Sequence, residues 1–278
     1  MRNLNQDNIT QAVIASFANT DNPRLKEIMI SLVQHLHAFA RDVKLTEAEW
    51  FQGIEFLTGC GHITDERRQE FILLSDVLGL SMLTVALNQH RPPGCTEATV
   101  FGPFHVKDAP HYPLGADIAN GAKGTPCLVQ GRVLNTDGQP VPHAHLDVWQ
   151  SDEDGLYDVQ HEGLAQAQAR GTLNADAEGR FHFRSIVAVP YAIPHDGPVG
   201  ALLQATGRHP WRPAHLHFKV EAPGYQTLIT HVFRNDSDYL DSDAVFGVRQ
   251  SLVCDWVAQA DGSYRLDYDF VLNPTQGG

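Results

Sequence analysis

The spacing of apolar residues changes at residue 91, and this change constrains the fold more than any other feature of the sequence. Before it, apolar side chains recur every three or four residues, as they do along one face of a helix. The RPPG segment at residues 91–94 interrupts a helix, and from about residue 124 the spacing becomes two residues, which is typical of strands. The clearest helical run comprises Leu25, Ile28, Met29, Leu32, Leu36 and Phe39.

This pattern predicts a mainly β protein with an α-helical N-terminal region. We expect a helical domain of about four helices at residues 1–92 and a Greek-key β-sandwich at residues 93–278. Within the helical part, Thr46 and Glu49 have the spacing of a capping box, and Gly59 and Gly61 are expected to end the helix that follows. The apolar stripes exceed what one small bundle can bury, so contact with a second copy is expected.

Composition excludes several classes of function. The 278 residues carry 20 Lys and Arg against 33 Asp and Glu, a net charge of −13 that argues against nucleic-acid and anionic-membrane partners. No segment approaches the ~20 apolar residues of a membrane span, and the first residues lack the apolar run of a signal peptide. The four cysteines form no CxxC pair, so reduced thiols and a cytoplasmic location are expected.

Histidine is unusually frequent, with 15 copies, and the segment RPAHLHFKV at residues 212–220 places two of them on one strand face. His215 and His217 would point away from the apolar Leu216 and Phe218, so both can bind one metal ion. The alternative is a pair of solvent-facing histidines. No cysteine lies nearby, which disfavours a thiolate zinc or iron–sulfur site, whereas a carboxylate or the loop tyrosines Tyr157 and Tyr191 are candidate partners.

Six segments in a fixed order resemble the intradiol ring-cleaving dioxygenases, the non-haem Fe(III) enzymes that open catechols between the two hydroxyls. The N-terminal helices are also similar to the dimerisation and linker region of that family, so the resemblance covers nearly the whole chain. The segments are VFGPFHV (100–106), PLGADIANG (113–121), LDVWQSDEDGLYD (146–158), VPYAIPHDGPVG (189–200), GRHPWRPAHLHF (207–218) and THVFRNDSDYLDSDAVFGV (230–248).

The resemblance implies one Fe(III) per subunit, with Tyr157, Tyr191, His215 and His217 as ligands. Two phenolates offset the charge of a trivalent cation, and neutral histidines add none. Tyr191 would leave the metal as it takes a substrate proton, while Tyr157 stays bound. Arg212 falls on the family's active-site arginine, whose positive charge can stabilise an anionic ring.

One position departs from the catechol-cleaving members, because His231 stands where many of them have glutamine. We expect it to hydrogen-bond beside the substrate or the iron ligands. Its segment THVF, together with LLSD (73–76) and YAIP (191–194), resembles the hydroxyquinol 1,2-dioxygenase branch.

The resemblance also implies a substrate pocket, in which Asp76 is the informative member. An acid in the apolar segment FILLSDVLGL needs a partner when it is buried, and a third substrate hydroxyl is one candidate; an internal cap or ion pair is the other. The expected wall consists of Leu73, Asp76, Val100, Phe101, Gly102, Pro103, Phe104, Ile193, Pro194 and Val245.

The sequence therefore favours cleavage of hydroxyquinol (benzene-1,2,4-triol) by O₂ to 3-hydroxy-cis,cis-muconate (maleylacetate), in aromatic catabolism. Catechol or chlorocatechol 1,2-dioxygenase is the alternative within the family, and a non-catalytic binding module or a zinc hydrolase lies outside it. A homodimer formed through the N-terminal helices is expected, with phospholipid as a possible interface component. The second HxH pair, His143 and His145, matches no family ligand, whereas His105 lies near the expected pocket.

Overall fold

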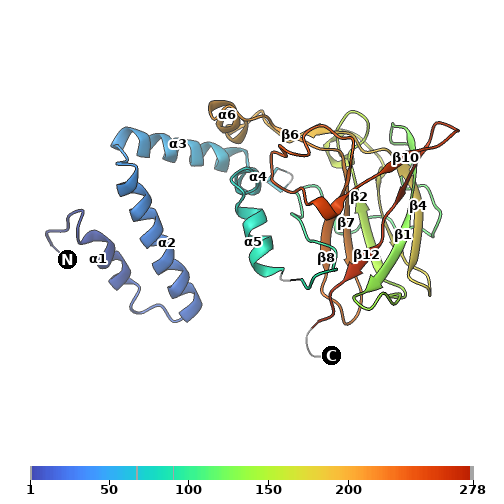
Figure 1. Ribbon diagram of the computed structural model, residues 1–278. Coiled ribbons are helices and arrows are strands. Elements are labelled where there is room, and N and C mark those ends of the chain that lie inside the picture. Colours follow the sequence, from blue (N-terminus) through green and yellow to red (C-terminus); the bar gives the residue numbers. More distant parts are fainter. Residues whose placement is uncertain (1, 67, 90, 276–278) are drawn as a thin grey trace. The chain divides into compact units, whose positions relative to one another are not determined.

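The computed structural model describes residues 2–66, 68–89 and 91–275 (Figure 1). Contacts within the chain divide it into two compact units, Met1–Gly59 and Cys60–Gly278. The domain boundary expected between residues 92 and 93 stays a prediction.

The helices begin where the sequence supplies capping groups. Asn22 accepts hydrogen bonds from the backbone N–H groups of Arg24 and Leu25, and Pro23 occupies the first turn. The capping box is confirmed, because Thr46 N–H donates to Glu49 and Glu49 N–H donates to Thr46 Oγ1. The first three helices are α1 (Ile9–Ser16), α2 (Pro23–Asp42) and α3 (Glu47–Ile63).

Two expectations about the helices are wrong. Helix α3 continues through Gly59 and Gly61, because glycine inside a helix costs only about 1 kcal/mol relative to alanine. The spacing of Phe71, Leu74, Leu78 and Met82 predicts one last helix, but the structure has two. Gly79 takes a left-handed conformation with φ of 74° and separates them. Five helices therefore precede the strands in the described residues, the last two being α4 (Glu70–Val77) and α5 (Leu80–Asn88).

The larger unit contains two five-stranded sheets, both with mixed strand directions. The first has the order β10-β11-β1-β12, with β4 also paired to β1, and the second has the order β3-β2-β7-β8-β9 (Figure 1). The first sheet contains β1 (Pro126–Asn135), β4 (Arg180–Ile186), β10 (Trp256–Ala258), β11 (Tyr264–Asp267) and β12 (Phe270–Leu272). The second contains β2 (His145–Trp149), β3 (Arg170–Asn174), β7 (His215–Glu221), β8 (Leu228–Arg234) and β9 (Val253–Cys254).

The core lies where the two sheets face each other. Leu216 and Phe218 from β7 are buried there, and the ring of Phe218 lies 4.7 Å from that of Phe270 and 6.3 Å from that of Phe181, measured between centroids. The expected fold class, a helical N-terminal region followed by a β domain, is confirmed. The opposite face of β7 is thereby left free for a polar site.

Two further elements connect this site to the sheets. A small ladder pairs β5 (Tyr191–Ala192) with β6 (Trp211–Arg212). Between them runs α6 (Pro198–Ala205). Pro198 lies in its first turn, a position to which proline is well suited.

No single helix in the described ranges is both long and apolar enough to cross a membrane. One bent pair, α4 with α5, satisfies the length and composition criteria jointly, with an angle of 77° between the two helices.

Candidate metal centre

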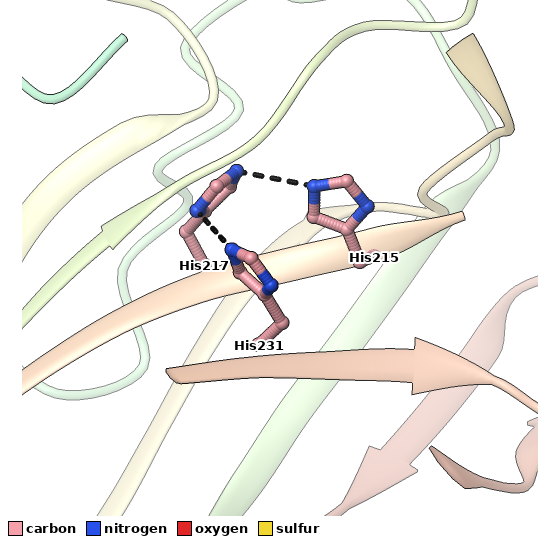
Figure 2. Close-up of side chains that lie close together, drawn as sticks. All are labelled: His215, His217 and His231. Carbon is pink, nitrogen blue, oxygen red and sulfur yellow. Dashed lines mark hydrogen bonds between the residues drawn. The ribbon is translucent and has the colours of Figure 1, made fainter. Parts of the chain in front are cut away.

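Strand alternation and strand pairing bring three histidines together. His215 and His217 share the polar face of β7, and His231 on β8 lies opposite His217 in the antiparallel register. Figure 2 shows the three rings close together, with hydrogen bonds from His217 to each of the other two. His215 and His217 are each 2% exposed and His231 is fully buried, so the alternative of solvent-facing histidines does not apply.

Hydrogen bonds constrain which nitrogens of these rings carry protons. His215 Nδ1 lies 2.7 Å from the carbonyl oxygen of Pro213, which can only accept, so its Nε2 holds a lone pair. His217 Nδ1 lies 2.8 Å from His231 Nε2, and His231 Nδ1 lies 3.1 Å from Thr99 Oγ1. When His217 donates from Nδ1, His231 accepts and in turn donates to Thr99, and a lone pair remains on Nε2 of His217.

Tyr157 follows β2 in a turn, and its hydroxyl oxygen lies 2.9 Å from Nε2 of His217. The Nε2 atoms of His215 and His217 are 3.1 Å apart. Two imidazole lone pairs and one phenol oxygen therefore converge on one point. Tyr191 completes the group, with its ring centroid 5.5 Å from that of Tyr157 and its side chain buried.

Arg212 enters this group because β5 and β6 pair Tyr191 directly with Arg212. Its Nη1 donates to His215 Nε2 over 3.2 Å and to the Tyr191 hydroxyl over 3.5 Å. Burial disfavours the cation, but the carboxylate of Asp243 outweighs it and raises the pKa of Arg212. A permanent positive charge is thus held beside the tyrosine oxygen.

The electrostatics of the cluster fit a bound cation. Burial, together with the Arg212 charge, lowers the pKa of His215 to about 3, and burial lowers the pKa of His217 and His231 well below its usual range. These rings are therefore neutral, as metal ligands must be. Burial and the neighbouring Tyr191 raise the pKa of Tyr157, so its phenolate forms only beside a strong positive charge.

A three-histidine site is the competing geometry, because ligand atoms of His215, His217 and His231 lie within 4.8 Å of one another. The hydrogen bond between His217 Nδ1 and His231 Nε2 argues against it. A nitrogen that accepts this bond has no lone pair left for a metal. His231 is better suited to orienting His217 from behind, as hydrogen-bonded partners of metal-binding histidines commonly do.

Half of the expected pocket wall lines one cavity of about 520 Å³. The members lining it are Leu73, Pro103, Phe104, Ile193 and Pro194. Phe104 also stacks on Tyr157, with ring centroids 4.4 Å apart, which connects this cavity to the tyrosine.

The other members of the wall lie around the cluster. Gly102 approaches so closely that an added Cβ would lie 3.2 Å from Cε1 of His217, and its φ of 76° also favours glycine. Phe101 packs against Trp149, which stacks on His217. Val100 and Val245 are both buried. Val245 follows the buried residues Asp243 and Ala244 in the chain.

Asp76 is buried at 4% exposure on α4. Burial raises the pKa of this carboxyl, and the nearby negative charge of Asp243 acts in the same direction. A hydrogen bond with Ser81 and the charge of Arg212 oppose the rise. Both interpretations from the sequence therefore keep support: Ser81 is an internal partner, and the proximity to Arg212 places the acid near the cluster.

Three residues that contact the cluster were not predicted from the sequence: Thr99, Trp149 and Asp243. Trp149 and Asp243 lie in segments that resemble the family, but their partners lie far away along the chain. His105 Nε2 lies 3.1 Å from a carboxylate oxygen of Asp147, and its ring packs against Trp149. Trp149 in turn stacks on His217. His143 is exposed.

The sequence and the fold of the chain match those of known enzymes. The family described as "Dioxygenase" matches residues 100–274, and the one described as "Catechol dioxygenase N terminus" matches residues 22–96. The chain belongs to the intradiol ring-cleavage dioxygenases, and the resemblance stated from the sequence is confirmed.

Its relatives include enzymes named for hydroxyquinols. It is 68% identical to a 6-chlorohydroxyquinol 1,2-dioxygenase of Cupriavidus pinatubonensis, over 99% of this chain and 100% of the relative. It is 52% identical to a hydroxyquinol 1,2-dioxygenase of Nocardioides simplex, over 97% and 96% of the two chains. The crystal structure of hydroxyquinol 1,2-dioxygenase from Pseudomonas putida aligns with a TM-score of 0.90 at 46% identity, covering 97% of this chain and 99% of that one.

Proposed function

We propose that the chain is a ferric dioxygenase that cleaves hydroxyquinol between the 1,2-hydroxyls with O₂, giving 3-hydroxy-cis,cis-muconate (maleylacetate). The observation that carries the proposal is the buried convergence of Tyr157 Oη, His215 Nε2 and His217 Nε2 on one point beside Tyr191 and Arg212. Zinc hydrolases do not need two buried tyrosines at the metal, and a binding module needs neither the tyrosines nor the buried arginine.

Tyr157, Tyr191, His215 and His217 would hold the iron. When bound, Fe(III) supplies a strong positive charge that favours the tyrosine phenolates and draws electron density from a catechol-type ring. The chain's own residues do the rest. Tyr191 is the general base for one substrate hydroxyl, because its oxygen lies beside Arg212, and Tyr157 is held in place by Phe104 and His217.

Arg212 stabilises negative charge that develops on the substrate ring and its oxygens. Its guanidinium is already oriented and buried, so little reorganisation is needed when that charge appears. His231 keeps His217 in the tautomer with a free Nε2 through the bond to Nδ1.

We propose that Asp76 selects the third hydroxyl of hydroxyquinol. A buried carboxyl can accept a hydrogen bond from the third hydroxyl of the substrate, and catechol would leave it without this partner. The names of the relatives support a hydroxyquinol or a chlorinated hydroxyquinol as substrate. Catechol and chlorocatechol remain the alternatives within the family.

The test compares turnover of hydroxyquinol, 6-chlorohydroxyquinol, catechol and chlorocatechol, with product analysis to identify the diacid. The proposal expects hydroxyquinols to be preferred, and Asp76→Ala to lower the hydroxyquinol-to-catechol ratio of kcat/KM by about tenfold, the value of one hydrogen bond to a charged or strongly polar group. Ser81→Ala is the matched control, since it keeps the carboxyl and removes the hydroxyl that bonds to Asp76 and Ser75. An unchanged ratio in Asp76→Ala would contradict this role.

We propose a homodimer formed through the N-terminal helices. The apolar stripe of α2 supports it, because Leu25, Leu32 and Phe39 are each 46–54% exposed in the single chain. Phospholipid at that interface and a cytoplasmic location stay predictions. Light scattering of the purified protein, with lipid extraction and mass spectrometry, tests the dimer and the lipid separately.

A further inference from the structure

The segment Asp243–Gly247 lies against the guanidinium of Arg212. Asp243 Oδ1 accepts from Arg212 Nε over 3.0 Å, and Asp243 Oδ2 accepts from Arg212 Nη2 over 3.3 Å. The two side chains are 2% and 3% exposed, so this is a forked ion pair shielded from water. Asp243 thereby occupies one edge of the guanidinium and leaves Nη1 for Tyr191 and His215.

The same carboxylate also fixes the backbone around it. Oδ1 accepts from the N–H of Val245 over 3.2 Å, and Oδ2 accepts from the N–H of Gly247 over 2.9 Å. Four donors therefore converge on two oxygens, which is about the full accepting capacity of a carboxylate. Val245, a member of the expected pocket wall, is positioned by the acid that positions Arg212.

Two features show that the rest of the segment is shaped to this contact. Phe246 has a φ of 59°, a left-handed conformation that a bulky residue rarely adopts unless its surroundings hold it there. A Cβ on Gly247 would lie 3.0 Å from Arg212 Nη2 and 3.1 Å from Asp243 Oδ2. A side chain at this position would force the ion pair to shift.

We propose that Asp243 is a positioning residue for the ring-cleavage reaction: it directs Nη1 of Arg212 at the tyrosine and substrate oxygens and sets the pocket wall through Val245. This inference rests on the proposed function. Without the carboxylate, the guanidinium could rotate about its side-chain bonds, and a shift of about 1 Å in such a group costs about 100-fold in rate.

The experiment uses the full-length iron-loaded protein with Asp243→Asn, Asp243→Glu and, as the matched control, Asp241→Asn. Asp241 is exposed in the same loop. Asp243→Asn keeps the shape but turns an N–H group toward Arg212. We expect kcat for hydroxyquinol to fall about 100-fold with a much smaller change in KM, and the visible tyrosinate-to-iron absorption to shift, since Nη1 of Arg212 leaves the Tyr191 oxygen. Asp243→Glu should recover part of both.

The outcomes separate this inference from the proposed function. If the wild-type protein does not cleave hydroxyquinol, the proposed function is wrong. If the wild type does cleave it, and Asp243→Asn binds iron with the kcat and absorption of Asp241→Asn, the positioning role is wrong. Should Asp243→Asn not fold, Gly247→Ala displaces the ion pair while the carboxylate stays; the same loss of kcat supports the role, and wild-type kcat and absorption contradict it.

Discussion

The chain carries the motif His-x-His twice, at residues 143–145 and 215–217, and the two copies have opposite surroundings. His143 is exposed with a left-handed φ of 56°, and His145 bonds to Asn174 and Asp147 at the start of β2. His215 and His217 are buried on the inner β7, within reach of two tyrosines and an arginine. A metal-binding spacing is therefore only as informative as the strand that carries it and the side chains that face it.

The two motifs also differ in the hydrogen bonds that their ring nitrogens make. Nδ1 of His215 bonds to a backbone carbonyl and Nδ1 of His217 bonds to His231, so both Nε2 atoms point at one place. In the other copy, both nitrogens of His145 are already bonded to oxygens of neighbouring side chains. The Nε2 atom of His145 therefore bonds to a carboxylate, whereas the Nε2 atoms of His215 and His217 lie 3.1 Å from each other.

The largest contrast is expected between the second histidines of the two motifs, His145 and His217. His217→Asn should weaken iron binding by more than about 100-fold, because it removes a ligand and not only a residue that orients one. It should also abolish turnover. His145→Asn should leave iron content and turnover at the wild-type values. Metal analysis after dialysis, with oxygen uptake on hydroxyquinol, measures both. Equal iron content in the two variants would break the distinction drawn between the copies.

A large effect with iron retained is expected at Tyr191. Tyr191→Phe should lower kcat by about 1,000-fold, within the usual range for losing a general base, because the proton acceptor beside Arg212 is removed. Tyr157→Phe should instead strip the iron or bleach its colour. Comparing iron content with kcat in the two variants checks the assignment, and the reverse pattern would exchange the roles of the tyrosines.

The smallest effect is expected in the pH dependence of stability. Burial lowers the pKa of His215, His217 and His231, so in the iron-free protein they stay neutral when folded and take up protons when unfolded. Their contribution is present above about pH 6.5 and is lost as the pH falls, by about 1.4 kcal/mol per pH unit for each ring. His231→Gln should reduce this slope by one ring's share.

Urea unfolding at several pH values between about 7.5 and 5 measures that slope. The matched control is His143→Asn, which should leave it unchanged because that side chain is exposed. If His231→Gln and His143→Asn gave the same slope as the wild type, the three buried rings would not act as the structure indicates.

Strand faces and helix caps, which depend on residues close together in the sequence, were predicted from local patterns. The alternation in RPAHLHFKV placed Leu216 and Phe218 in the core and the histidines on the other face, and the capping box at Thr46 formed as expected. The ends of the helices around Gly59 and Gly79 were predicted less well, since a glycine can continue a helix or leave it depending on the contacts that surround it.

Contacts between distant parts of the chain were beyond reach of such patterns. Thr99 and His231 are 132 residues apart, and Arg212 and Asp243 are 31 apart. The resemblance to the family named Arg212, but the acid that holds it lies in a loop whose polar residues look alike in sequence. Strand pairing and a strained turn at Phe246, visible only in three dimensions, single out Asp243.

Reconstitution of the metal-free protein with iron in air, followed by visible absorption, tests the two-tyrosine centre most directly. We expect a red-brown protein whose absorption rises to a plateau at one iron per chain and is bleached in Tyr157→Phe. A wild-type protein that binds one iron per chain and remains colourless would contradict it.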